Sequence, residues 1–213
     1  ISDLRIHRNT VQAFSRTWFE QGMANLSALA KWPSVEALDK KLAGVPMVIV
    51  APGPSLAKNS GQLRALAGRA IITAFSHSLK PVLAAGVVPD LVITVDPQDV
   101  RYHFAGTDVS RTCLVNAATA HPSLFELGAP RYLTLSANCS IDDWMFDALG
   151  ENALVPGGGS VATSAFSLAV PSPWWASAFS PPSLRLRPRP RKRLSPSPGP
   201  ASSPSPGEFW RTL

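Results

Sequence analysis

The sequence predicts an α/β protein with a doubly wound, mostly parallel sheet. From Met47 onward, short apolar runs rich in β-branched residues alternate with segments of helical spacing. The apolar runs lack in-out alternation, which is typical of strands that are covered on both faces. Turn-forming residues follow several of these runs. In open α/β sheets such turns lie at the carboxyl ends of the strands, where ligands bind.

Residues 1–44 are expected to form a helical lead-in to this sheet. Between Asn9 and Trp32, apolar residues recur at roughly helical spacing with polar residues between them. Pro33 ends this amphipathic helix, because the residue before a proline disfavours helical backbone. A second short helix is expected over Val35–Leu42.

Residues 45–170 are expected to form the α/β domain. Strands are predicted over Met47–Ala51, Ala70–Phe75, Leu91–Val95, Thr112–Asn116, Tyr132–Leu135 and Ala153–Val155. Helices are predicted over Gln62–Ala67, Leu79–Ala85 with Gly86 as its cap, Pro122–Leu127, Ile141–Leu149 and Val161–Ala169.

The excess positive charge is confined to the end of the chain. The formal net charge is +6, yet residues 1–170 hold equal numbers of basic and acidic side chains. Residues 171–213 are rich in Pro, Ser and Arg, so we expect a disordered tail there. Either an error in the reading frame or a natural basic tail that touches nucleic acid or membrane explains this composition. The neutral body predicts neither a nucleic-acid partner nor a membrane partner.

Neither a membrane span nor a disulfide framework is expected. Glycines and prolines interrupt the uncharged run over residues 152–184, which argues against a spanning helix. Cys113 and Cys139 are the two cysteines, and their spacing fits reduced, buried thiols better than a disulfide. These features predict a cytoplasmic protein.

The first candidate ligand loop lies in residues 48–56, which read Val-Ile-Val-Ala-Pro-Gly-Pro-Ser-Leu. A strand ends in a turn built from Pro52, Gly53 and Pro54, and Ser55 follows. Beside a glycine, backbone N–H groups can face an anion without a side chain in the way. The spacing matches neither the ATPase loop nor the dinucleotide fingerprint. A phosphate-binding loop and a structural turn both remain open.

Asp96 is the candidate catalytic carboxylate. It follows the strand predicted over Leu91–Val95 and precedes Pro97, so it should lie at the rim of the sheet beside the Gly53 turn. A metal or ribose contact is one interpretation. An ordinary turn or helix-cap aspartate is the other.

A second candidate loop contains Gly158, Gly159 and Ser160, directly before the helix predicted over Val161–Ala169. Together with Thr163 it combines close backbone approach, free N–H donors and hydroxyl groups at a helix start, which suits a phosphate. A plain capped turn is the alternative.

The histidines give weaker evidence for a functional site than the two loops and Asp96. His7, His77, His103 and His121 do not share the spacing of a metal site. His103, close behind Asp96, is a possible general base, although an exposed or capping role is the default expectation. The chain has no Gly-x-Ser-x-Gly elbow and no Cys/His cluster, so hydrolase and zinc interpretations lack support.

Four blocks, in order and spacing, resemble the motility-associated-factor (Maf) flagellin glycosyltransferases over roughly residues 9–170. That family shares its central domain with archaeal 6-hydroxymethylpterin diphosphokinases and is related to sialyltransferases that use CMP-sugars. The blocks are Ala51-Pro52-Gly53-Pro54-Ser55-Leu56, Leu79-Lys80-Pro81-Val82-Leu83 with Gly86 and Pro89-Asp90, Val95-Asp96-Pro97-Gln98, and Gly158-Gly159-Ser160-Val161-Ala162-Thr163.

The resemblance implies a Rossmann-like, sialyltransferase-like domain. The loops Gly53–Ser55 and Gly158–Thr163 would hold a nucleotide's phosphates, with Asp96 nearby. The implied reaction moves a nonulosonic sugar from a CMP donor to a Ser or Thr of flagellin. Pyrophosphate transfer from ATP with Mg to a pterin is the alternative. No tightly bound cofactor and no resident metal are expected, because the nucleotide is a substrate.

The sequence departs from the family after residue 170. The family continues with an apolar strand and a Gly-x-Asp-like turn that finish the active site, and residues 171–213 have no counterpart to them. The domain is therefore expected to be incomplete at its carboxyl end. This predicts a transferase fragment with little or no turnover, or a non-catalytic remnant that binds nucleotide.

Overall fold

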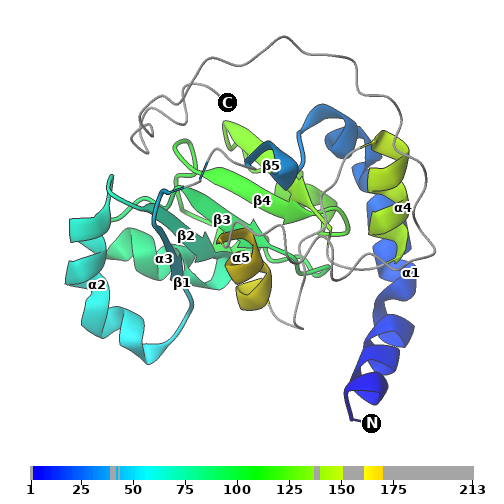
Figure 1. Ribbon diagram of the computed structural model, residues 1–213, viewed down its shortest axis with the longest axis horizontal. Coiled ribbons are helices and arrows are strands. Elements are labelled where there is room, and N and C mark those ends of the chain that lie inside the picture. Colours follow the sequence, from blue (N-terminus) through cyan, green and yellow to red (C-terminus); the bar gives the residue numbers. More distant parts are fainter. Residues whose placement is uncertain (1, 39–41, 43, 137–139, 151–160, 170–213) are drawn as a thin grey trace.

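The computed structural model describes residues 2–38, 42, 44–136, 140–150 and 161–169, which form a parallel five-stranded sheet with packed helices (Figure 1). The strands are β1 (Met47–Val50), β2 (Ile71–Phe75), β3 (Leu91–Thr94), β4 (Cys113–Ala117) and β5 (Arg131–Leu135). Their spatial order follows the chain, β1-β2-β3-β4-β5, and every pairing is parallel. The predicted α/β fold class is confirmed.

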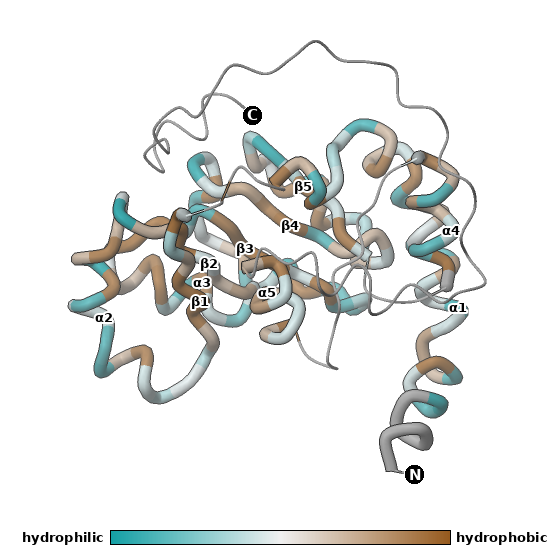
Figure 2. Tube along the Cα trace, in the orientation of Figure 1, coloured by the Kyte–Doolittle hydropathy of each residue, from teal (hydrophilic) through white to brown (hydrophobic). Residues whose placement is uncertain are grey.

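Both faces of the sheet are covered. Every residue of β2, β3 and β4 is buried, and successive side chains of a strand point to opposite faces. Helix α3 (Ser76–Ala84) packs against β2 and β3, and α5 (Val161–Ala169) packs against β1 and β3. Figure 2 shows the apolar residues concentrated along these central strands. Because both faces of these strands are buried, their sequences do not alternate between apolar and polar residues.

Helix α5 brings the chain back across the sheet. β1 and β5 are the two edges of the described sheet, and α5 follows β5 in the chain yet lies beside β1 and β3. In a doubly wound sheet, the strand order reverses where the chain returns to the first strand. The described strands run in chain order without that reversal.

The amino-terminal lead-in is a long helix followed by a segment that joins the sheet. Helix α1 (Ser2–Lys31) confirms the predicted amphipathic helix and begins earlier. The short helix η1 (Val35–Leu38) ends before the predicted boundary. Between them, Ser34 forms a parallel bridge with Thr134 of β5, and the Thr134 N–H donates to Pro33 O at 3.0 Å.

Two further helices begin several residues earlier than the sequence predicts. Helix α2 (Pro54–Leu66) starts directly after the turn that follows β1, although the predicted start was Gln62. Pro54 occupies the first helical turn, where its fixed φ is favourable and its missing N–H is not needed. Helix α3 starts at Ser76 instead of Leu79, immediately after β2. Its predicted cap is confirmed, since Gly86 has a φ of +74°.

The remaining described elements are short: η2 (Arg101–His103), η3 (Pro122–Phe125) and α4 (Ser140–Leu149). Cys113 is a free, buried thiol, as expected, and burial raises its pKa to about 12. None of the described helices combines the length and apolar character of a membrane span. The predictions for Cys139, for a strand over Ala153–Val155, for the loop at Gly158–Ser160 and for the tail over residues 171–213 lie outside the described residues.

Candidate functional site

The carboxyl ends of β1, β2 and β3 lie side by side at one end of the sheet, which we call its carboxyl edge. Val50, the last residue of β1, pairs with Ala74, and Phe75, the last residue of β2, pairs with Ile93. The segments that follow these strands therefore leave from adjacent points of the edge where open α/β sheets bind ligands. These segments are the turn at Pro52-Gly53, the start of α3 and the turn at Asp96.

The Gly53 turn presents an open helix start. Gly53 is the N-cap of α2 and has φ −175° and ψ 163°, an extended backbone that any residue adopts. A β-carbon at Gly53 would lie 3.9 Å from Ser55 Oγ, an ordinary contact. Gly53, Pro54 and Ser55 are all exposed. Neither backbone strain nor neighbouring atoms require glycine here, so a requirement for glycine would have to come from a ligand.

A buried serine fixes this turn relative to α3. The Ser78 side chain is fully buried, and its hydroxyl donates to Val50 O at 2.6 Å. The same oxygen accepts the Phe75 N–H at 2.9 Å. Ser78 thereby joins the last residues of β1 and β2 to the first turn of α3. The spacing between the Gly53 turn and the amino terminus of α3 depends on this contact.

Asp96 lies at the end of β3, as predicted, and also shapes its own turn. Its Oδ1 accepts the Gln98 N–H at 2.8 Å, which is the contact of an aspartate turn. The following carbonyl, Pro97 O, accepts a hydrogen bond from Gln21 Nε2 of α1 at 2.6 Å. Asp96 therefore has the turn-forming role that the sequence offered as one of its two interpretations. The described residues contain no group of three His, Cys, Asp or Glu side chains that could hold a metal ion.

Two histidine rings in tilted contact follow β2 and β3 on the same side of the sheet. Lys80 Nζ of α3 donates to Tyr102 O of η2 at 2.9 Å, and the ring centroids of His77 and His103 are 4.1 Å apart. Burial lowers the pKa of His103, and the charges of His77 and Lys80 add to this effect while Asp96 opposes it. Sequence spacing could not reveal the pair, because its members follow different strands.

The second predicted loop is described only in part. Thr163 is exposed in the first turn of α5, the helix that lies against β1 and β3. Gly158, Gly159 and Ser160 lie outside the described residues. Thus the structure brings the Gly53 turn and Asp96 to one edge and sets the helix of Thr163 against the same strands.

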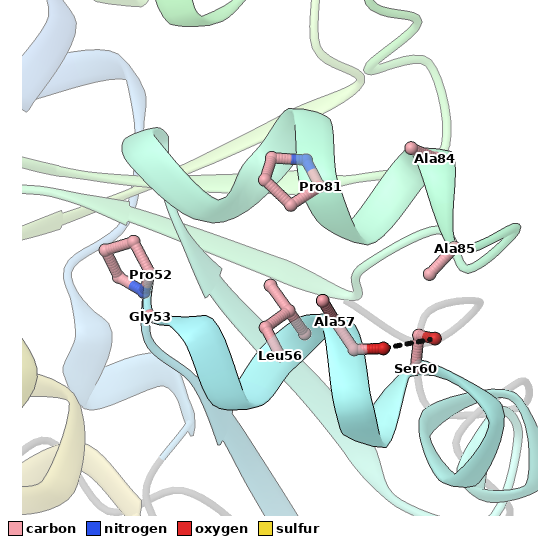
Figure 3. Close-up of a pocket in the computed structure, with 8 residues that line it drawn as sticks. All are labelled: Pro52, Gly53, Leu56, Ala57, Ser60, Pro81, Ala84 and Ala85. Atoms are coloured by element: carbon pink, nitrogen blue, oxygen red, sulfur yellow. Dashed lines mark hydrogen bonds between the residues drawn. The ribbon is translucent and has the colours of Figure 1, made fainter.

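An apolar groove adjoins the Gly53 turn. It lies between α2 and α3, has a volume of about 470 Å³ and starts at Pro52 and Gly53 (Figure 3). The other lining residues are Leu56, Ala57, Ser60, Pro81, Ala84 and Ala85. The one polar side chain among them, Ser60, donates to Ala57 O at 3.3 Å. With no charged lining residue, the groove suits an apolar group and not a phosphate.

Comparison with known families assigns the chain. A model of the 6-hydroxymethylpterin diphosphokinase MptE-like family matches residues 20–172, most of the sequence. The chain belongs to this family. The matched residues of this MptE-like chain include the Gly53 turn, Asp96 and α5, and they confirm the family predicted from the four sequence blocks. No curated protein matches the chain.

One solved structure resembles this MptE-like fold. It is the Maf glycosyltransferase from Magnetospirillum magneticum AMB-1, with a TM-score of 0.46 and 19% sequence identity. The match covers 57% of this chain and 20% of that chain. The matched part of the MptE-like chain spans about a fifth of the length of that protein.

Proposed function

We propose that this chain is the nucleotide-binding part of a transferase, with the phosphates of the nucleotide at the carboxyl edge of β1, β2 and β3. The register that sets Val50 beside Ala74 and Phe75 beside Ile93 carries the proposal. It brings two helix starts, those of α2 and α3, next to each other. Free backbone N–H groups and the positive ends of both helix dipoles then favour an anion.

The residues assigned to the phosphates are those of the two loops. Gly53, Pro54 and Ser55 are exposed at the start of α2. Gly158, Gly159, Ser160 and Thr163 precede or begin α5, and the position of α5 against β1 and β3 supports their inclusion. Asp96, at the end of β3, is assigned to the reaction itself. The apolar groove beside Gly53 is suited to an uncharged part of the substrate.

For the reaction, we propose transfer of a nonulosonic, sialic-acid-like sugar from a CMP donor to a Ser or Thr hydroxyl of flagellin in the cytoplasm. The support is the resemblance of the four sequence blocks to Maf glycosyltransferases. The family model favours a second candidate, pyrophosphate transfer from ATP with Mg to a hydroxymethylpterin. A chain that binds nucleotide without turnover is the third possibility, because the sequence resemblance to the family ends at about residue 170.

Calorimetric titration with CMP, and separately with ATP and Mg, tests both the site and the nucleotide. Gly53→Val should weaken binding by about tenfold or more, since blocking one hydrogen bond to a charged group costs about 1.5–3 kcal/mol. Gly61→Val is the matched control, because Gly61 lies on the same helix with nothing within 4 Å of its β-carbon position. We expect it to bind like the parent.

The backbone of Gly53 makes this test decisive. Its φ of −175° accommodates valine without strain, so the variant should keep the circular dichroism spectrum of the parent. If Gly53→Val is folded and binds both nucleotides as tightly as the parent, the turn is purely structural. Preference for CMP supports the glycosyltransferase, and preference for ATP supports the diphosphokinase.

A further inference from the structure

His77 and His103, which we call the imidazole pair, connect the start of α3 to η2. The ring planes are inclined by 48° with centroids 4.1 Å apart, and the Tyr102 ring lies 4.0 Å from that of His103. The hydrogen bond from Lys80 Nζ to the backbone carbonyl of Tyr102 holds η2 against α3. The pair therefore lies at the carboxyl ends of the strands, as the Gly53 turn does, since α3 begins where β2 ends.

The two rings differ in burial and in hydrogen bonding. His103 Nε2 is buried without a hydrogen-bond partner, and an imidazolium must donate from both nitrogens. A charge on His103 would thus leave a buried donor unsatisfied. The His77 ring is exposed, with Nδ1 3.2 Å from Ser76 Oγ. Its Nε2 has no hydrogen-bond partner among the described residues, so this nitrogen is free to donate to a bound ligand.

The charges around the pair come from three segments. Lys80 of α3 and Asp96 after β3 act in opposite directions on the pKa of His103, where burial and His77 add to the effect of Lys80. On η2, Arg101 is paired with Asp99 at 2.6 Å. Apart from Asp96, no unpaired carboxylate acts on His103 in the described residues, so a bound anion would add the missing negative charge.

We propose that His77 contacts a phosphate of the nucleotide and that the imidazole pair takes up a proton when the nucleotide binds. The inference rests on the proposed function, because it needs the phosphates at the starts of α2 and α3. The proton comes from solvent and stays on the His77 ring, with Nε2 donating to a phosphate oxygen. A charge-assisted hydrogen bond of this kind is about twice as strong as a neutral one.

Calorimetry in two buffers with different protonation enthalpies, PIPES and Tris, measures this proton directly. At pH 7, CMP or ATP binding to the parent should take up a fraction of a proton. His77→Gln should lose that uptake and bind about tenfold more weakly. The difference between parent and variant cancels any proton exchanged by the phosphate itself.

Two further variants assign the proton. His103→Phe keeps an aromatic ring against His77 but cannot titrate, so proton uptake should persist. His121→Gln is the matched control, because His121 also bonds a serine, with Nδ1 2.7 Å from Ser123 Oγ, but lies outside the pair. Uptake retained by His77→Gln, or lost only in His103→Phe, would overturn the inference.

The outcomes separate the two proposals. If the parent binds neither nucleotide, the proposed function fails and the inference fails with it. Nucleotide binding with the same apparent enthalpy in both buffers leaves the proposed function standing and overturns only the assignment of His77. Weaker binding by both His77→Gln and His121→Gln to the same extent would also overturn it, since the effect would not be specific to the pair.

Discussion

At the scale of single residues, Ser78 determines the geometry of the candidate site. Ser78→Ala removes the donor to Val50 O and the acceptor of the Phe75 N–H, both in a fully buried position. We expect the free energy of unfolding to fall by about 1–3 kcal/mol, the cost of buried polar groups left unpaired. Urea denaturation measures the change. Ser60→Ala, which removes one long, exposed contact, should stay within about 0.5 kcal/mol of the parent.

A residue-scale alternative is that water replaces the Ser78 hydroxyl. In that case Ser78→Ala would be as stable as Ser60→Ala, and the link between β1 and α3 would not depend on the side chain. The same comparison informs on the site, because the Gly53 turn follows Val50 directly. Nucleotide affinity should fall together with stability if the spacing of α2 and α3 matters for binding.

At the scale of elements, α1 packs against the segments that follow β3 and β4, next to the candidate site. Asn25 is buried, and its amide nitrogen donates to Ala118 O and Ala120 O, each at 2.8 Å, just after β4. Nearby, Gln21 contacts the Asp96 turn through Pro97 O. These side chains of α1 contact backbone carbonyls that follow β3 and β4. The amino-terminal helix therefore packs beside the carboxyl ends of β3 and β4.

Asn25→Leu tests this role of α1. Leucine has the same branching at Cγ but is larger and cannot donate, so both carbonyls lose a partner, and we expect a loss of about 2–3 kcal/mol. Hydrogen exchange should accelerate in α1 more than in β2 and β3. Leu26→Asn, on the exposed side of the same helix, is the control. Equal protection of α1 in Asn25→Leu and the parent would contradict the assignment.

At the scale of the whole molecule, His103 links stability to pH. Its pKa in the folded protein is lowered from the ordinary 6.5, so the unfolded chain binds the proton more readily. Stability contributed by neutral His103 is therefore present above about pH 6.5 and is lost as the pH falls below it. Urea midpoints measured from pH 7 to pH 5 should decline less steeply for His103→Phe than for the parent. Parallel declines would refute this linkage.

The sequence by itself determined the sheet and two parts of the candidate site. Continuous apolar runs predicted β1 to β5 because strands covered on both faces need no polar side. Gly53 and Asp96 were predicted at the rim because both directly follow such runs. The start of α2 was placed too late, since Asn59, Ser60 and Gly61 look like a loop. Pro54 at the first turn of the helix prevails over them.

Only the tertiary structure decided how these parts meet. The order β1-β2-β3 and its register set the ends of three strands level, and local periodicity carries no information about register between distant segments. The imidazole pair depends on η2 folding back on α3. The Asn25 contacts likewise join residues far apart in the chain. Such contacts arise from the packing of complete elements, so a motif of a few neighbouring residues cannot reveal them.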